Sequence, residues 1–69
     1  MSDIEFHLNG KKIRKNIPLS LQDLVEEHNL QRKKIAIEVD GEIIPRSLHH
    51  CTEVKAGAKI EIVHAVGGG

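Results

Sequence analysis

Apolar and polar residues alternate in the first segment of the chain. Ile4, Phe6 and Leu8 are apolar, and the residues between them are Glu and His. This period of two is typical of a β-strand with one buried face. An Asn-Gly pair follows at residues 9–10, and Asn-Gly is the strongest short hairpin signal because a type I′ turn needs a positive φ at both central positions. The sequence therefore predicts a strand, a tight turn and a partner strand at residues 11–17.

The predicted partner strand is only half apolar on its inner side. Ile13 and Ile17 share that side with Lys11 and Lys15. Lysines protect the unpaired edge of a sheet from association with another chain. We therefore expect this strand at an edge of the sheet.

A short amphipathic helix is predicted at residues 21–28. The hydroxyl of Ser20 can cap its first turn, and Asp23, three residues further on, suits a capping box. Asn29 tolerates the left-handed conformation that ends many helices. Four residues fall on one stripe of this helix: Leu21, Leu24, Val25 and His28.

A second hairpin follows the helix. The segment 35–39 predicts a third strand, and Asp40-Gly41 predicts another tight turn. Residues 42–44 then form a returning strand, which Pro45 ends because proline cannot donate to a sheet ladder.

Residues 45–58 have an irregular pattern. Leu48, Cys51 and Val54 recur at threefold spacing, which predicts a helical turn packed under the sheet. Gly57 marks the turn into the last strand.

The last predicted strand runs over residues 59–66. Ile60 and Ile62 should point inward, so Val63 and Ala65 should lie on the opposite face. Val63 is then an apolar residue on the side where a solvated strand is normally polar.

The predicted order is strand, strand, helix, strand, strand, strand. One helix can cover only one face of so small a sheet, so the expected fold class is α+β. This is the order of a β-grasp, or ubiquitin-like, fold with a mixed sheet of four to five strands, in which the first and last strands pair in parallel at the centre. We expect one such domain over residues 1–66, followed by a flexible glycine tail at residues 67–69.

Composition narrows the possible functions. The chain has 69 residues, its ten Lys and Arg balance ten Asp and Glu, and Phe6 is its one aromatic residue. Such a neutral chain, with almost no base-stacking surface, is not expected to bind nucleic acid. No apolar stretch approaches the roughly 20 residues of a membrane span, and the N-terminus lacks a signal-peptide pattern. Because the single cysteine cannot form an internal disulfide, we expect a cytoplasmic protein.

Residues 49–51 contain atoms that can bind metals. Adjacent residues such as His49, His50 and Cys51 point in different directions, however, and a structural zinc site needs four convergent ligands, so we expect no metal site. Cys51 shares the spacing of Leu48 and Val54 and is expected to be a small buried hydrophobe. A catalytic thiol would need an oriented histidine beside it. The other histidines are expected at the surface or its boundary: His7, His28 and His64.

Several surfaces are candidates for contact with a partner. The basic residues within 11–15 and 32–34 suit an acidic partner, but we favour a solvated edge and loop. Val63 with Ala65 is better material for a partner surface, although single exposed apolar residues are common. Arg46 can contact a partner or cap loop carbonyls, and the sequence leaves both roles open.

Three glycines at residues 67–69 follow the last strand. At an average glycine usage of about 7%, chance rarely places such a run at the end of a chain. Glycine lacks a Cβ, so a Gly-Gly end can pass through a narrow channel in an enzyme and present its carboxylate as the reactive group. The alternative is an idle end, because terminal residues are often disordered or added by cloning.

Four segments form a recognisable combination: Leu-Asn-Gly at 8–10, Ser-Leu-Gln-Asp-Leu at 20–24, Ile-Ala-Ile-Glu-Val-Asp-Gly-Glu-Ile-Ile-Pro-Arg at 35–46, and Ile-Glu-Ile-Val-His-Ala-Val-Gly-Gly-Gly at 60–69. Through these segments the chain resembles the ThiS family of bacterial sulfur carrier proteins in thiamine biosynthesis. The resemblance extends over nearly the whole chain. It departs from the family at Ala58, where Asp is common, and near Ala65, where an aromatic residue is common.

The resemblance implies a carrier that is a substrate of other enzymes and has no catalytic site or bound cofactor of its own. The carboxylate of Gly69 would be adenylylated with ATP and Mg by an E1-like, ThiF-type enzyme and converted to a thiocarboxylate. The sulfur would come from a donor such as a cysteine desulfurase and pass to a ThiG-type thiazole synthase. The tail that enters the partners' active sites would be Gly67, Gly68 and Gly69. The partner-binding surface is expected at Val63, Ala65, Val66 and Arg46.

Other functions use the same kind of chain end. A related carrier could serve molybdopterin or another sulfur-requiring pathway. A ubiquitin-like modifier could be attached to lysines, and a plain protein-binding module could carry an idle tail.

Overall fold

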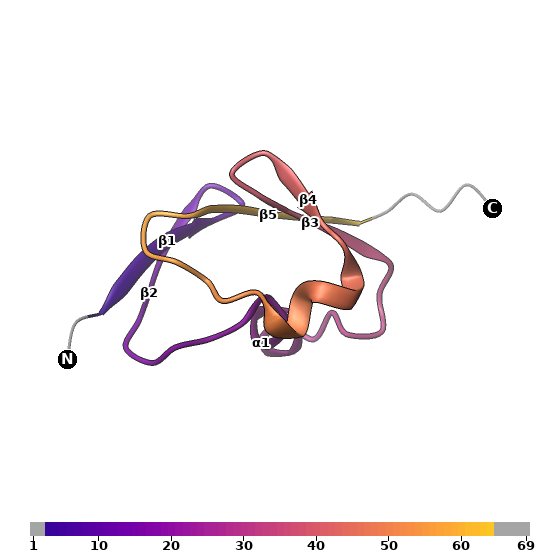
Figure 1. The fold of residues 1–69 in the computed structure, drawn as a ribbon, viewed down its shortest axis with the longest axis horizontal. Coiled ribbons are helices and arrows are strands. Elements are labelled where there is room, and N and C mark those ends of the chain that lie inside the picture. The colour runs from indigo at the N-terminus through magenta and orange to yellow at the C-terminus, as the bar shows by residue number, and fades with distance from the viewer. Residues whose placement is uncertain (1–2, 65–69) are drawn as a thin grey trace.

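A five-stranded mixed sheet and two helices on one of its faces make up the computed structural model, which describes residues 3–64 (Figure 1). The elements in chain order are β1 (Ile4–Leu8), β2 (Lys11–Lys15), α1 (Leu21–Glu27), β3 (Ile35–Val39), β4 (Glu42–Ile44), the 3₁₀-helix η1 (Arg46–Cys51) and β5 (Lys59–His64). The strand order in the sheet is β2-β1-β5-β3-β4. The last strand is therefore the central one.

Strand β5 is paired on both sides. It runs parallel to β1, with Leu8 beside Ile60, and antiparallel to β3, with Ile37 opposite Ile62 and Ile35 opposite His64. The parallel pairing of the first and last strands confirms the predicted β-grasp arrangement. Strand β2 pairs with β1 alone, so the prediction of an edge strand is also confirmed.

Both predicted hairpins form, and both have the backbone angles that their sequences suggest. Asn9 and Gly10 have φ of 51° and 82°, and Asp40 and Gly41 have φ of 52° and 89°. Asparagine, aspartate and glycine are the residues that adopt this left-handed region most readily. The two turns thus fix the registers of β1 with β2 and of β3 with β4.

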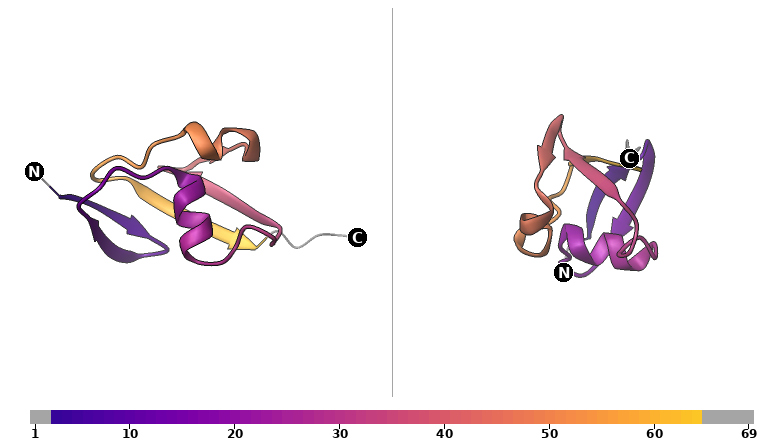
Figure 2. Two further views of the ribbon diagram at one scale, coloured as in Figure 1. Left: turned by 90° about the horizontal axis from the view of Figure 1, so that it is seen from below. Right: turned by 90° about the vertical axis from the view of Figure 1, so that its right-hand side faces the viewer.

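The core lies between the sheet and α1, and α1 lies alongside η1 on the same face (Figures 1 and 2). Its largest fully buried side chains are Phe6, Leu21, Leu24, Ile37 and Ile60. They come from β1, α1, β3 and β5, so each of these elements contributes to one apolar cluster. Burial of a large aliphatic or aromatic side chain contributes roughly 1.5–3 kcal/mol, which makes this cluster the main source of stability.

Helix α1 begins as predicted. The Ser20 hydroxyl accepts a hydrogen bond from the Asp23 amide at 3.1 Å, and the Asp23 carboxylate accepts one from the Ser20 amide at 2.8 Å. The backbone around this cap is also tied to the segment after η1, because Leu21 N–H donates to the Thr52 carbonyl and Val54 N–H donates to Leu19. The capping box therefore anchors the helix and the connection to β5 together.

Two elements are shorter than predicted. Strand β2 ends at Lys15, and Ile17 is 63% exposed, because Lys15 already lies opposite Ile4, where the partner strand begins. Helix α1 ends at Glu27, and the predicted last helical residue, His28, is an exposed C-cap. Asn29 follows with a φ of 58°, as its expected role in ending the helix requires.

The helical turn after Pro45 exists, but its predicted buried face was wrong. Leu48 is 46% exposed and Cys51 is exposed, whereas His49 is only 3% exposed. The Nε2 atom of His49 donates to the Ile44 carbonyl at 3.0 Å, so the imidazole is buried with a hydrogen-bond partner. Val54 is buried as predicted.

An ion pair joins β1 and β2 on the open face of the sheet, which is the face away from α1 and η1. Arg14 contacts the Glu5 carboxylate through its guanidinium group, and the two residues lie opposite each other in the strand register. Hydrogen bonding and charge attraction from Arg14 lower the pKa of Glu5 and raise the pKa of Arg14. A second pair, Lys15 with Glu27 at 2.7 Å, links β2 to α1.

No helix in the segment 3–64 is long and apolar enough to cross a membrane.

Replacing one buried isoleucine should destabilise the fold, whereas the same change on the open face should not. Ile37→Val removes one methylene from a fully buried site and should lower the free energy of unfolding by about 1 kcal/mol. Ile43→Val, at a residue that is 67% exposed on the neighbouring strand, should change it by less than about 0.5 kcal/mol. Urea denaturation of both variants measures the difference. Equal losses would contradict the assignment of the two faces.

The Arg14→Gln variant should raise the pKa of Glu5 towards that of an isolated carboxyl group, because the main cause of its depression is removed. Since the pKa of Glu5 is lower in the folded chain than in the unfolded chain, the pair stabilises the fold above the unfolded pKa, and this contribution is lost as the pH falls through the lowered pKa. NMR titration of the Glu5 carboxyl measures the shift. Lys15→Gln, which removes a cation bonded to Glu27 instead, is the control and should leave the titration of Glu5 unchanged.

Candidate functional site

The C-terminal end of β5 is the candidate functional site, because the glycine segment continues from it. His64 is the last residue that the structure describes. The predicted site residues Ala65, Val66, Gly67, Gly68 and Gly69 lie outside the described residues. Their nearest described neighbours in the chain, Ile62 to His64, belong to β5. Strand β3 pairs with β5 as far as its last residue, where Ile35 lies opposite His64.

A hollow lies beside this strand end on the side of the helix. Its lining residues come from β1, the first turn, the end of α1 and β5: Leu8, Asn9, His28, Leu30, Ile62 and His64. Both histidines are exposed, as predicted, while Leu8 and Ile62 are buried. The strand end thus has an apolar floor with two imidazole rings at its rim.

The Asn9 side chain contacts β5 in this hollow. Its Oδ1 atom accepts a hydrogen bond from Ile62 N–H at 2.8 Å, and its Nδ2 group donates to the Ile62 carbonyl at 3.2 Å. Sequence reasoning assigned Asn9 only to the turn. A side-chain contact between residues 53 positions apart has no local sequence signal.

One predicted site residue on β5, Val63, lies among the described residues, on the open face of the sheet. Val63 is 49% exposed and lies opposite Ala36, on the face away from the core, as predicted. Ile43 of β4 is 67% exposed on the same face, and sequence reasoning missed it. The alternation of β4 could have found it, because its neighbour Ile44 packs on the core.

Two carboxylates separate these apolar residues. Glu38 of β3 lies directly opposite Glu61 of β5, and both are half-buried. Like charges directly opposite each other across two strands destabilise a sheet slightly. The centre of this face is therefore acidic, with Val63 towards the C-terminal end of β5 and Ile43 towards the sheet edge.

Arg46 has the loop-capping contact that was one of its two expected roles. Its Nη2 group donates to the Gln31 carbonyl at 3.0 Å, which ties the start of η1 to the loop before β3. Because β3 begins at Ile35, opposite His64, this contact lies towards the end of the sheet where β5 ends. Contact of Arg46 with a partner remains a prediction.

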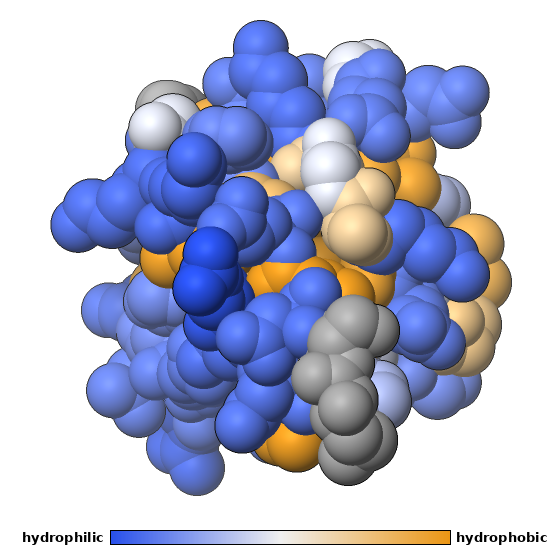
Figure 3. Space-filling model, turned by 90° about the vertical axis from the view of Figure 1, so that its left-hand side faces the viewer, coloured by the Kyte–Doolittle hydropathy of each residue, from blue (hydrophilic) through white to orange (hydrophobic). Residues whose placement is uncertain are grey.

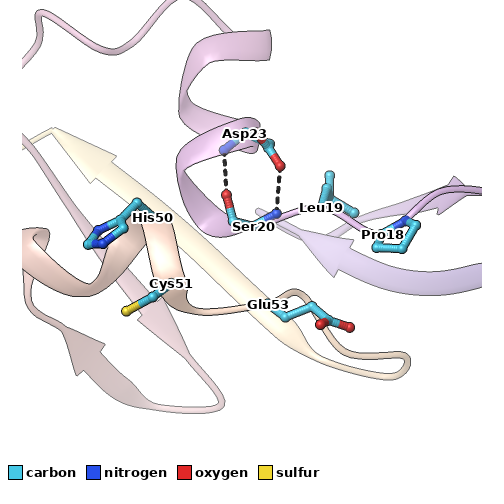
Figure 4. A pocket seen from close by; sticks show the side chains of 7 residues that line it. All are labelled: Pro18, Leu19, Ser20, Asp23, His50, Cys51 and Glu53. Atoms are coloured by element: carbon cyan, nitrogen blue, oxygen red, sulfur yellow. Dashed lines mark hydrogen bonds between the residues drawn. The ribbon is translucent and has the colours of Figure 1, made fainter.

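The segment around Cys51 is not arranged as a thiol site. Cys51 is exposed, which corrects the expectation of a buried residue, and its thiol donates to the Leu48 carbonyl at 3.5 Å. Figure 4 shows His50 and Cys51 beside a pocket near the Ser20 cap, and no hydrogen bond joins the His50 ring to the Cys51 sulfur in this described segment. Within residues 3–64, no three His, Cys, Asp or Glu side chains are grouped closely enough to hold a metal ion.

The opposite end of the molecule, where β5 begins, has a different character. Figure 3 shows a mostly hydrophilic surface there, with apolar atoms in a central recess and along the right-hand edge of the view. Ile17, which is 63% exposed, follows β2 at its end remote from the first hairpin turn. It offers a comparison for the exposed apolar residues of the open sheet face.

Comparison with known proteins places these features in a family. The sulfur carrier protein ThiS of Bacillus subtilis is 40% identical over 63 residues, which cover 90% of this chain and 96% of that protein. A thiazole synthase of Paramagnetospirillum magneticum is 32% identical over 62 residues, which cover 90% of this chain but 19% of that protein. The crystal structure of the thiamine biosynthesis protein ThiS from Geobacter metallireducens matches with a TM-score of 0.75 at 25% identity, over 96% of this chain and all (100%) of that one.

The solved structure has the same overall fold as this chain, as its TM-score of 0.75 over 96% of the chain indicates. The family model itself extends from Ile4, in β1, through the glycine segment to Gly69. With this match over residues 4–69, the chain belongs to the ThiS family.

Proposed function

We propose that this protein is a sulfur carrier of thiamine biosynthesis and that the carboxylate of Gly69 is the group that carries sulfur. The observation that supports this most directly is the family match, which runs through the three glycines to residue 69. The Bacillus subtilis relative, which is named as a sulfur carrier, also supports the proposal, because the match to it covers 90% of this chain.

The chemistry of the proposal requires activation of the carboxylate. A carboxylate is a poor acylating group at neutral pH, because its leaving group would be oxide. Reaction with ATP forms an acyl-adenylate and releases pyrophosphate. Sulfide that attacks the acyl carbon displaces AMP and gives the thiocarboxylate directly. A persulfide donor gives an acyl disulfide instead, and a thiol must then cleave its S–S bond, releasing the thiocarboxylate and forming a disulfide with the donor sulfur.

The machinery for these steps is assigned to partners. The E1-like activating enzyme supplies the Mg²⁺ and the cationic groups that bind the phosphates. A cysteine desulfurase, or a similar enzyme, supplies the sulfur. The carrier supplies an acyl group on a segment narrow enough to enter another protein's active site, because glycine has no side chain.

Thiazole synthase is the proposed acceptor of the sulfur. The match to 19% of a thiazole synthase supports this, because it indicates a ThiS-like segment within the same polypeptide as that enzyme. It favours the thiazole of thiamine over molybdopterin as the destination of the sulfur. We assign the docking of both partners to Val63 on the open sheet face, to Arg46 at the start of η1 and, outside the described residues, to Ala65 and Val66.

The central prediction concerns the mass of the C-terminal peptide. After incubation of the full chain with its activating enzyme, ATP and a sulfide source, we expect one oxygen of Gly69 to be replaced by sulfur, as measured by intact-mass and peptide mass spectrometry. Deletion of Gly69 should abolish this change, since it draws the carboxylate back by about 3.5 Å. The deletion should alter the free energy of unfolding by less than about 0.5 kcal/mol, because the described core extends only to Ile62.

A matched control separates the chain end from the one thiol. Cys51→Ser removes the exposed cysteine and should leave thiocarboxylate formation unchanged. Sulfur found on Cys51 instead of the C-terminal peptide would refute the proposed carrier chemistry.

The docking assignment predicts a difference between two exposed apolar residues. Val63→Ser should raise the KM of the activating enzyme for the carrier about tenfold, because a central apolar contact in an interface contributes more than 1 kcal/mol. Ile17→Ser, at a comparably exposed residue outside the open face, should leave KM within about twofold of the wild type. Steady-state kinetics with thermal unfolding as a fold control measure both. An unchanged KM for Val63→Ser would exclude this face as the docking surface.

A further inference from the structure

The hydrogen-bond ladder between β1 and β5 is cut short by the first turn. Only His7 with Lys59 and Leu8 with Ile60 are paired in this parallel register. The chain then reverses at Asn9, whose backbone N–H makes the last backbone contact, to the Ile60 carbonyl at 2.9 Å. The C-terminal half of β5 therefore has no β1 backbone beside it.

The Asn9 carboxamide occupies the next position of the ladder. Successive residues of a strand direct their backbone groups to alternate sides, so the N–H and carbonyl of Ile62 face the same side as those of Ile60. Asn9 satisfies both groups of Ile62, through Oδ1 at 2.8 Å and Nδ2 at 3.2 Å. A carboxamide carries one acceptor and one donor group in a plane, as a peptide unit does. The side chain thus substitutes for the strand that the turn removes.

The second hairpin makes a related contact at the other end of β5. Asp40 N–H donates to the Lys59 carbonyl at 2.8 Å, and the Asp40 Oδ1 atom accepts from Lys59 N–H at 2.9 Å. Asp40 and Asn9 have nearly the same φ, 52° and 51°, and each precedes a glycine. The two turns therefore hold β5 at its first residue and, through Asn9, two residues before its described end.

We infer that Asn9 is a positioning residue for the chemistry at the chain end. Its carboxamide keeps Ile62 in line with the sheet, and residues 65–69 continue covalently from the strand segment held in this way. The inference rests on the proposed function, since it assigns Asn9 to the presentation of the Gly69 carboxylate to the activating enzyme.

The physical basis is the cost of leaving Ile62 without these partners. The Ile62 residue is only 8% exposed, and an unsatisfied backbone group at a buried site costs more than a hydrogen bond contributes when formed. Without Asn9, β5 can lower this cost by separating from its neighbours beyond Ile60. The segment that carries the acyl group would then continue from a strand end that is no longer fixed against the sheet, and misplacement of a reacting group lowers the rate strongly.

The test compares Asn9→Gly with Asp40→Gly. Glycine adopts a φ near 50° without strain, so each variant keeps its turn and its backbone N–H and loses only the side-chain bonds to β5. Both variants should lower the thermal midpoint similarly. A role in fold stability alone would therefore affect the chemistry equally in the two variants.

Hydrogen exchange, measured on the carrier alone, gives the first readout. In Asn9→Gly, the Ile62 amide should exchange about tenfold faster than in the wild type. In Asp40→Gly, the Lys59 amide should exchange faster while the Ile62 amide stays protected. An unchanged Ile62 amide in Asn9→Gly would overturn the inference without any reference to the enzyme.

Thiocarboxylate formation with the activating enzyme, ATP and sulfide gives the second readout. We expect kcat to fall about tenfold for Asn9→Gly with KM within about twofold, because the defect lies in placing the acyl carbon and not in docking. Asp40→Gly should keep the wild-type kcat. A wild-type kcat in Asn9→Gly, or an equal fall in both variants, would overturn the positioning role. If the wild-type chain itself forms no thiocarboxylate, the proposed function fails, and this role of Asn9 fails with it.

Discussion

The parallel pairing of β1 with β5 is the constraint on which the rest of the structure depends. It brings the first and last strands side by side and places the last strand at the centre of the sheet, between β1 and β3. Phe6, Ile37 and Ile60, one from each of these strands, are fully buried beneath the helix. The end of β5 is paired with β3 up to His64, whereas on the β1 side it is held only as far as Ile62, by the Asn9 side chain.

The two faces of the sheet differ in character. One face lies against α1 (Figure 1) and holds the apolar cluster. The other face carries charged residues with a few exposed apolar ones. A chain of 69 residues buries only about 60% of the surface that its unfolded form exposes, so it has little room for an internal active site. Under the proposed carrier function none is required, because the partner enzymes would supply the reaction chemistry.

Local chemistry explains which parts of the fold could be predicted from the sequence. Asn9-Gly10 and Asp40-Gly41 set both hairpins, and Ser20 with Asp23 sets the start of the helix, because each signal acts within a few residues. Strand length was less predictable, since β2 stops where its partner strand begins. The buried face of η1 was missed because residues three apart share a face whichever of the three faces is buried. The contact from His49 to the Ile44 carbonyl decides which face packs on the core.

The candidate site shows the same division. Val63 was predicted on the open face because alternation along a strand fixes which side each residue takes. The contact of Asn9 with Ile62 was not predictable, since it depends on the tertiary arrangement of segments 53 residues apart. Sequence reasoning thus found the residues whose position follows from their own element and missed those that act across elements.

The central place of β5 also has a consequence for biosynthesis. A ribosome makes Lys59–His64 after all the other elements, so β1 and β3 must wait for the strand that joins them. Pairings between distant parts of a chain form late and slowly in folding. A nascent chain interrupted before this strand would expose two unsatisfied strand edges, which marks it for proteolysis or chaperone binding. A chain that ends before β5 is therefore not expected to accumulate as a folded protein.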